Sequence, residues 1–130
     1  MTPIFQTDYS KKTGNCLQAC IASIFDLNMF EVPNLLEQTQ DAPELWRLLS
    51  EWCEKKLNCK SVLIEVSAES EFLIANLLCV AIGKAKVSGQ DHAVVWCNNV
   101  VHDPSLGGKG FINKPTTFLV FCPLRPKAGK

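Results

Sequence analysis

The sequence predicts an α+β fold in which N-terminal helices pack on an antiparallel β-sheet. Apolar residues recur every three or four positions in the first half of the chain, as in amphipathic helices. Short alternating or continuous apolar runs, typical of strands, occupy the second half. Helices and strands segregated in this way form α+β domains, rather than the alternating β-α-β units of a parallel sheet.

Length and composition indicate one folded domain. The chain has 130 residues, 47% of them hydrophobic, and its 13 Lys+Arg balance 13 Asp+Glu. A chain of this size buries about two-thirds of its surface on folding. We expect a single domain over residues 1–122 and a flexible tail over residues 123–130, where prolines interrupt a polar stretch. The neutral net charge gives no basic surface for nucleic acid or for an anionic membrane.

Neither a signal peptide nor a transmembrane segment is recognisable. The N-terminal residues lack a basic start followed by an apolar stretch. The longest apolar run, Leu77–Ile82, is far shorter than the roughly 20 residues that cross a bilayer. We therefore expect a soluble, cytoplasmic protein.

Three helical segments are expected before residue 58. The first covers residues 16–25, and Asn15 or Thr13 can cap its start. A short helical turn, interrupted by a proline, is expected over residues 30–36. The strongest helix is expected over residues 42–57, with Asp41 as its N-cap. Its apolar face consists of Leu45, Leu48, Leu49, Trp52 and Cys53.

After residue 58 the apolar pattern changes to that of strands. Five strands are expected, over residues 61–66, 78–82, 92–97, 100–103 and 116–122, together with a short helix over residues 69–77. Asn98 and Asn99 tolerate the positive φ angles of a tight turn, so the third and fourth strands should form an antiparallel hairpin.

Seven cysteines stand beside only two histidines, and their spacing argues against disulfides and against metal. The cysteines occupy positions 16, 20, 53, 59, 79, 97 and 122, with no Cys-x-x-Cys pair. Most lie in apolar runs, where cysteine packs as a small hydrophobic side chain. We expect no metal or other cofactor. Zinc held by Cys16, Cys20, His92 and His102 is the least favoured alternative.

Cys16 differs from the other cysteines because it opens the first predicted helix. Free backbone N–H groups and the positive end of the helix dipole favour a thiolate there, as a nucleophile requires. Position alone still favours a core role, like that of Cys20 one turn later. Other residues must therefore decide between the two interpretations.

A base for Cys16 must come from one of the two histidines. His92 begins a strand at the rim of the sheet, and hairpin pairing brings Asp103 near it, where the carboxylate could hold the second ring nitrogen. His102 adjoins Asp103, so strand alternation points it to the opposite face, and we treat it as non-catalytic. Taken singly, His92 also fits a surface histidine, and Asp103 fits a turn residue before Pro104.

Amide side chains supply candidates for an oxyanion hole. Gln6 lies upstream of Cys16 and could donate to a developing oxyanion together with the backbone N–H of Cys16. We expect Gln18 to point from its helix to solvent. Asn15 is expected to act mainly as a helix cap, and the alternative is that it lines the oxyanion site.

These residues resemble the papain-like cysteine peptidase fold. The branch they resemble most is the bacteriocin-processing (double-glycine leader) peptidases and related small bacterial and phage proteins. The segments that carry the resemblance are Gln6, Gly14–Ile24, His92–Val95 and Val101–Pro104, followed by Gly107 or Gly108.

The resemblance implies Cys16 as nucleophile, His92 as general base and acid, Asp103 as the residue that orients His92, and Gln6 as oxyanion donor. Two positions depart from the family pattern. Gln6 stands ten residues upstream of Cys16, further than in the family, and Leu17 replaces the glycine that often follows the cysteine. Residues 11–12 could loop out to bring Gln6 into place.

We expect a cysteine-dependent amide hydrolase, a peptidase or isopeptidase that forms an acyl-enzyme and acts on a peptide or protein. The alternative is a papain-like module with little or no activity that binds a protein partner, for example a phage or mobile-element protein that blocks a host factor. A third interpretation is that the same three residues carry out acyl or amide transfer on a small molecule or a cell-wall peptide. Segments 30–40 and 106–114 are the expected cleft walls, and neither names the substrate. The oligomeric state is left open.

Overall fold

The computed structural model describes residues 1–10, 14–86 and 88–124. It is an α+β fold with a five-stranded antiparallel sheet in the order β1-β5-β2-β3-β4. The strands are β1 (Cys59–Glu65), β2 (Cys79–Lys84), β3 (Asp91–Trp96), β4 (Val100–His102) and β5 (Thr117–Pro123). The α-helices are α1 (Cys16–Ile24), α2 (Leu35–Gln38), α3 (Ala42–Trp52) and α4 (Ala68–Leu73). The predicted α+β class is confirmed.

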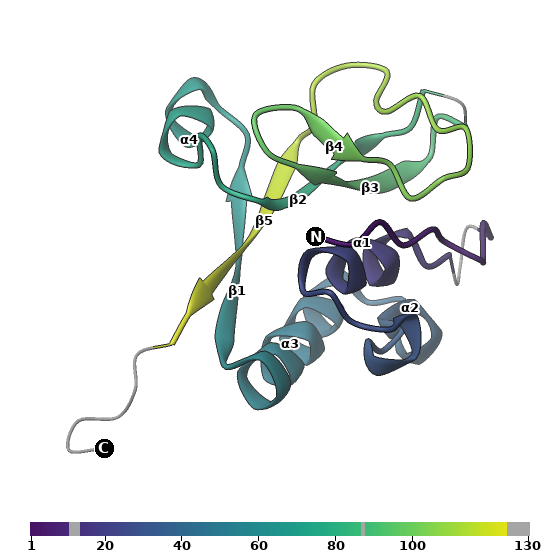
Figure 1. The fold of residues 1–130 in the computed structure, drawn as a ribbon, viewed down its shortest axis with the longest axis vertical. Coiled ribbons are helices and arrows are strands. Elements are labelled where there is room, and N and C mark those ends of the chain that lie inside the picture. The colour runs from purple at the N-terminus through teal and green to yellow at the C-terminus, as the bar shows by residue number, and fades with distance from the viewer. Residues whose placement is uncertain (11–13, 87, 125–130) are drawn as a thin grey trace.

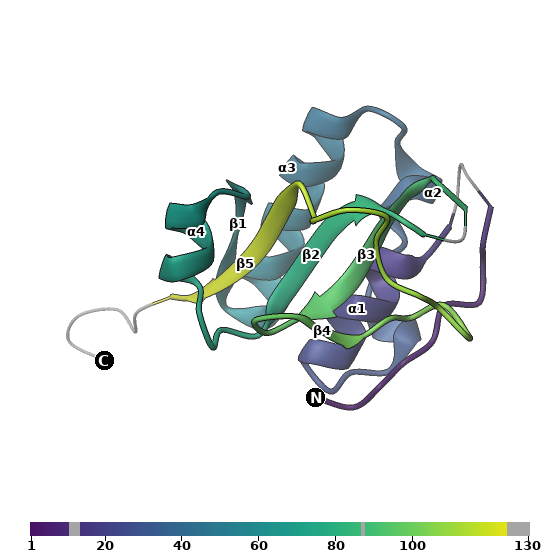
Figure 2. The ribbon, with the colours of Figure 1, turned by 90° about the horizontal axis from the view of Figure 1, so that it is seen from above.

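Helices α1, α2 and α3 lie on one side of the sheet, and α4 lies at the end of β1 remote from α3 (Figure 1). Seen from above, the five strands lie side by side across α1 and α3 (Figure 2). Helix α1 packs mainly on β3. This contact brings the start of the first helix to the strand that carries His92.

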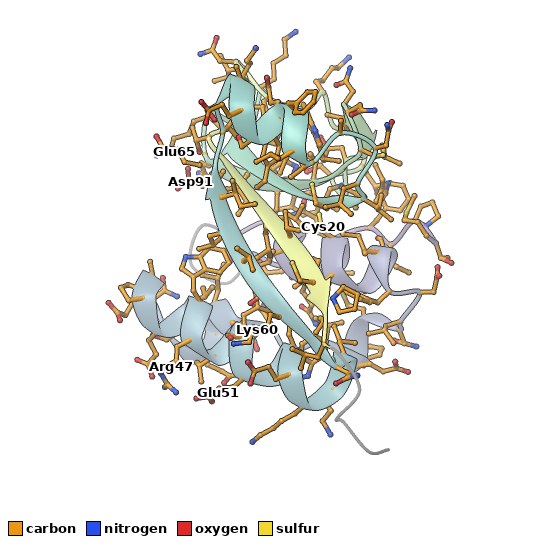
Figure 3. All side chains as sticks on the ribbon, turned by 90° about the vertical axis from the view of Figure 1, so that its left-hand side faces the viewer. Cys20, Arg47, Glu51, Lys60, Glu65 and Asp91 are labelled. Atoms are coloured by element: carbon orange, nitrogen blue, oxygen red, sulfur yellow. The ribbon has the colours of Figure 1, made fainter. Side chains whose placement is uncertain are left out.

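The sheet has an apolar cluster on each face. One cluster joins α1 and α3 to the sheet through buried residues that include Ile21, Leu49, Val95 and Leu119. The other lies on the opposite face and includes Ile74, Val94 and Phe118. Adjacent residues of β3 and β5 belong to different clusters because strand side chains alternate between faces. Figure 3 shows Cys20 in the interior and the Arg47–Glu51 ion pair on the outer side of α3.

Several element boundaries differ from the prediction. The helix expected over 42–57 becomes α3 followed by a π-helical turn, η2 (Cys53–Leu57), which Asn58 ends with a φ of +50°. The segment expected to be helical over 30–36 forms a 3₁₀ turn, η1 (Met29–Glu31), and then α2. Helix α4 ends at Leu73 rather than Leu77, and Asn76 has a φ of +67°. Asparagine tolerates this left-handed conformation, which stops a helix.

The first two residues of the predicted tail, Pro123 and Leu124, belong to or adjoin the sheet. Pro123 is the last residue of β5, and the Leu124 N–H donates to the Asn58 carbonyl at 3.0 Å. The remainder of the predicted tail, residues 125–130, lies outside the described residues. Within the described part of the chain, no helix combines the length and the apolar character needed to cross a membrane.

Candidate active site

Cys16 is the first residue of α1, and its side chain is half-buried. The next turn is fully buried from Ala19 to Ser23, which fixes the helix against the sheet. Asn15 does not cap this helix with its side chain, contrary to the prediction. Thr13, the other predicted cap, lies outside the described residues.

The Asn15 side chain instead holds the N-terminal segment. Its Oδ1 accepts from the backbone N–H groups of Thr7 and Asp8 at 2.9 and 3.0 Å, and its Nδ2 donates to the Thr7 hydroxyl at 2.8 Å. Residues 6–9, which we call the N-terminal strap, are therefore fixed to the start of α1. The strap runs alongside α1 and below the loop that follows β4 (Figure 1).

His92 and Asp103 form the strongest polar contact of the site. His92 Nε2 lies 2.7 Å from Asp103 Oδ1, and the two side chains are only 8% and 10% exposed. The carboxylate also accepts from the backbone N–H groups of Ser105 at 2.9 Å and Gly110 at 3.0 Å. Since Nε2 is occupied by Asp103, Nδ1 is the ring nitrogen left for Cys16, whose side chain lies close enough to raise the pKa of the His92 ring.

The surroundings of His92 favour its protonated form. Burial of the ring lowers its pKa, but the hydrogen bond with Asp103, the nearby Cys16 side chain and the charges of both residues outweigh burial and raise the pKa to about 9. Burial of the Asp103 carboxyl raises its pKa, but the bonds from His92 and Ser105 dominate and hold that pKa below its usual value. The pair is therefore an ion pair near neutral pH.

Gly108, rather than Gly107, is the glycine that the Asp103 loop requires. A Cβ on Gly108 would overlap Cγ and Oδ2 of Asp103, whereas a Cβ on Gly107 would meet open space. Gly107 has a φ of +66°, which only glycine adopts readily. The structure thus explains why glycine stands at both positions, but only Gly108 makes room for the Asp103 carboxylate.

Gln6 lies in the same site, buried and lining the same cleft as Cys16. Its backbone N–H donates to the Pro104 carbonyl at 2.9 Å, and its Nε2 donates to the Asp8 carbonyl at 3.2 Å. Residues 11–12, which could loop out to bring Gln6 into place, lie outside the described residues. The Gly14 N–H donates to the Ser10 carbonyl at 2.9 Å, so residues 10 and 14 lie next to each other.

An open cleft of about 570 Å³ adjoins these residues. The predicted wall over 106–114 contributes residues 106–110, but the predicted wall over 30–40 contributes only Leu36. The connection between β2 and β3 forms a wall that we did not predict, through Lys84, Ala85, Ser88, Gly89, Gln90 and Asp91. Its small residues at 88–89 were the available signal, since loops at strand ends commonly line functional sites.

The remaining polar candidates have structural partners. His102 Nε2 lies 2.7 Å from the Ile4 carbonyl, and its ring packs edge-on against Phe5 at 4.9 Å. Gln18 does not point to solvent as we predicted. Its Nε2 donates to the carbonyls of Met29 and Val32 at 2.9 and 2.7 Å, which joins α1 to the segment that follows it.

All seven cysteines are free thiols. Burial raises the pKa of the Cys20 thiol well above its usual value, and the charges of Cys16 and Asp103 raise it further. Among the described residues, no group of three or more His, Cys, Asp or Glu side chains is arranged to hold a metal ion. Cys16 is thus the one cysteine of the described chain that adjoins both a histidine and the cleft.

Comparison with known proteins gives no relative from which a role could be transferred. No protein-family model, curated protein sequence or solved structure matches the chain.

Proposed function

We propose that this protein is a cysteine-dependent amide hydrolase, a peptidase or isopeptidase of the papain-like type that forms an acyl-enzyme on Cys16. One observation carries the proposal. The His92 ring lies 2.7 Å from the Asp103 carboxylate through Nε2, and Cys16 lines the same open cleft close enough to raise the pKa of the ring. Nucleophile, base and the group that orients the base come from three separate elements.

The proposed reaction has two halves: Cys16 is first acylated by the substrate, and the acyl group is then released by water. Cys16 gives its thiol proton to His92 before the attack, and Cys16 Sγ then bonds to the carbonyl carbon of the amide while the carbonyl oxygen becomes negative. His92 then gives this proton to the leaving amine as the C–N bond breaks, which leaves a thioester on Cys16. In the second half His92 takes a proton from water, the hydroxide oxygen bonds to the thioester carbon, and the acid leaves as the thiol reforms.

Asp103 and Gln6 support this chemistry without bonding covalently to the substrate. Asp103 holds the His92 ring by Nε2, so Nδ1 faces the nucleophile, and its charge stabilises the imidazolium. Gln6 supplies an amide N–H to the oxygen that becomes negative in the tetrahedral intermediate, together with the backbone N–H of Cys16. Gln6 is thus assigned to the oxyanion hole, although it stands further from Cys16 along the chain than the corresponding glutamine of the family does.

The cleft favours a hydrolase over a module that only binds a protein partner. A binding module needs neither a buried ion pair nor a thiol against a histidine, and burying such groups costs free energy unless they are paired. Here His92 and Asp103 are nearly buried, yet both line the cleft together with Cys16. The open cleft supports a peptide or protein chain as the substrate, with access to the thiol.

We also propose that the protein works in a reducing compartment, the cytoplasm. Seven free thiols, three of them not fully buried at Cys16, Cys97 and Cys122, suit an environment in which disulfides do not persist.

Alkylation by iodoacetamide tests the reactivity of Cys16. At mildly acidic pH we expect mass spectrometry to find Cys16 labelled before Cys122, although Cys122 is the more exposed thiol. Cys97 is the matched control, because it is half-buried like Cys16 and lacks a histidine partner among its described contacts. Labelling of Cys16 no faster than Cys97 would contradict the proposal.

Hydrolysis is tested with a mixture of peptides whose cleavage is followed by mass spectrometry. We expect product peptides from the wild-type chain and none from Cys16→Ala. Products that persist unchanged in Cys16→Ala would assign the activity to another part of the chain or to a contaminant, and the proposal would fail.

A further inference from the structure

Ser105 contacts two residues of the proposed site at once. Its hydroxyl donates to Gln6 Oε1 at 2.9 Å, and its backbone N–H donates to Asp103 Oδ1 at 2.9 Å. Ser105 also lines the cleft, between Asp103 and the glycine-rich segment 107–110. Neither the resemblance nor the proposed mechanism gives this serine a role.

The contacts of Gln6 fix which way its amide faces. The Asp8 carbonyl can only accept a hydrogen bond, so the atom that faces it at 3.2 Å must be Nε2. Oε1 then faces the Ser105 hydroxyl, which can donate. Nε2 carries two N–H bonds and Asp8 takes one of them, so the second is available to a ligand in the cleft that Gln6 lines.

Two hydrogen bonds join the N-terminal strap to the loop after β4, close to Gln6 and Ser105. The Gln6 N–H donates to Pro104, and the Leu106 N–H donates to the Tyr9 hydroxyl at 3.1 Å. These bonds hold the backbone of the strap but leave the three side-chain torsions of Gln6 free. Among the described residues, the Asp8 carbonyl and the Ser105 hydroxyl are the groups that hydrogen bond to the Gln6 amide itself.

We propose that Ser105 is a positioning residue: it orients the Gln6 amide so that an N–H, rather than the carbonyl oxygen, faces the oxyanion, and it ties this donor to Asp103. The inference rests on the proposed function. Without the Ser105 hydroxyl the amide keeps only the 3.2 Å bond to the Asp8 carbonyl among its described contacts, so it turns more easily and presents Oε1, which repels a developing negative charge instead of stabilising it.

Two reactions of Cys16 distinguish loss of the oriented Gln6 amide from a general disturbance of the site by the Ser105 substitution. Iodoacetamide alkylates the sulfur by displacing iodide and passes through no tetrahedral oxyanion. p-Nitrophenyl acetate acylates it: the S–C bond forms, the C–O bond breaks and nitrophenolate leaves, while His92 keeps the proton that the thiol gave up. Only the second reaction develops the charge that Gln6 would stabilise.

We expect Ser105→Ala to slow the burst of nitrophenolate about tenfold or more, and Gln6→Ala to slow it about 100-fold. The rate of Cys16 alkylation by iodoacetamide should stay within about twofold of wild type in Ser105→Ala, because its sulfur and imidazole remain in place. Ser105→Thr, which keeps the hydroxyl, should restore most of the burst rate. Ser50→Ala in α3 is the matched control and should behave as wild type.

A double mutant shows whether Ser105 acts through Gln6. In the Gln6→Ala background, the Ser105→Ala substitution should slow the burst no further, because the amide that it orients is absent. Independent, multiplicative losses would overturn the coupling. A Ser105→Ala chain with the wild-type burst rate would overturn the positioning role alone. A wild-type chain whose Cys16 is neither alkylated nor acylated ahead of the other cysteines would overturn the proposed function, and this inference with it.

Discussion

Gly108 lies so close to the Asp103 carboxylate that no methyl group fits between them. A Cβ on Gly108 would overlap Cγ and Oδ2 of Asp103, the residue that holds His92 at 2.7 Å. The neighbouring Gly107 has a positive φ but open space around it. One glycine therefore makes room for the carboxylate, while the other allows the chain to turn.

Gly108→Ala should displace the Asp103 carboxylate and weaken its bond to His92. We expect the pKa of His92 to fall from about 9 toward 6.5 or lower, because burial alone lowers it. An NMR titration of the ring measures this fall. Gly107→Ala is the control. It should cost about 1 kcal/mol in the free energy of unfolding through backbone strain, with the pKa of His92 unchanged. Equal pKa values of His92 in wild type and Gly108→Ala would contradict the argument.

The His92–Asp103 pair should give the protein a pH-dependent stability that Asp103→Asn removes. Folding raises the pKa of His92 from 6.5 to about 9, so its contribution is complete below 6.5 and is lost as the pH rises through about 9. Folding lowers the pKa of Asp103, so its contribution is lost as the pH falls below the usual value of 3.8.

Urea unfolding of wild type and Asp103→Asn at a series of pH values measures this contribution. The difference in free energy of unfolding should be largest between about pH 5 and pH 6, shrinking toward pH 9 and again toward pH 3. A difference that is constant across this range would mean that the ion pair does not form.

The sequence predicted the parts of the fold that depend on local patterns. Asp41 caps α3 by accepting from the Glu44 N–H at 3.2 Å, and Asn98 adopts a φ of +66° in the hairpin turn. Both outcomes follow from properties of single residues and their near neighbours. The proximity of His92 and Asp103 was also predictable, because a hairpin fixes which strand ends meet.

The prediction was wrong where an amide side chain bonds to backbone far along the chain. Asn15 and Gln18 could be assigned only by their place on a helix, which suggests a cap and a solvent-facing side chain. Their partners in the structure are backbone groups of Thr7, Asp8, Met29 and Val32. Ser105 had a usable local signal, since the aspartate two residues before it commonly accepts from such an N–H in an Asx turn.

The two histidines should respond to substitution in opposite ways. His102→Ala removes the bond to the Ile4 carbonyl and the contact with Phe5. It should lower the free energy of unfolding by about 1–3 kcal/mol without slowing the alkylation of Cys16. His92→Ala should remove the preferential alkylation of Cys16 at mildly acidic pH. Urea unfolding and iodoacetamide labelling measure the two effects. A loss of Cys16 labelling in His102→Ala equal to that in His92→Ala would reverse the assignment of the base.

Gln18 should contribute to stability rather than to catalysis. Its Nε2 donates to two carbonyls, of Met29 and Val32, and Val32 is only 2% exposed. Gln18→Ala leaves both carbonyls without this donor, so we expect the free energy of unfolding to fall by about 2 kcal/mol.

Gln38→Ala is the matched control, because Gln38 is exposed on α2 and should change the free energy of unfolding by less than about 0.5 kcal/mol. Gln18→Glu sharpens the test, since a carboxylate keeps the shape of the side chain but can only accept hydrogen bonds when ionised. It would face two carbonyl oxygens and should be at least as destabilising as alanine. Urea unfolding curves that place Gln18→Glu close to wild type would show that the two carbonyl contacts contribute nothing to stability.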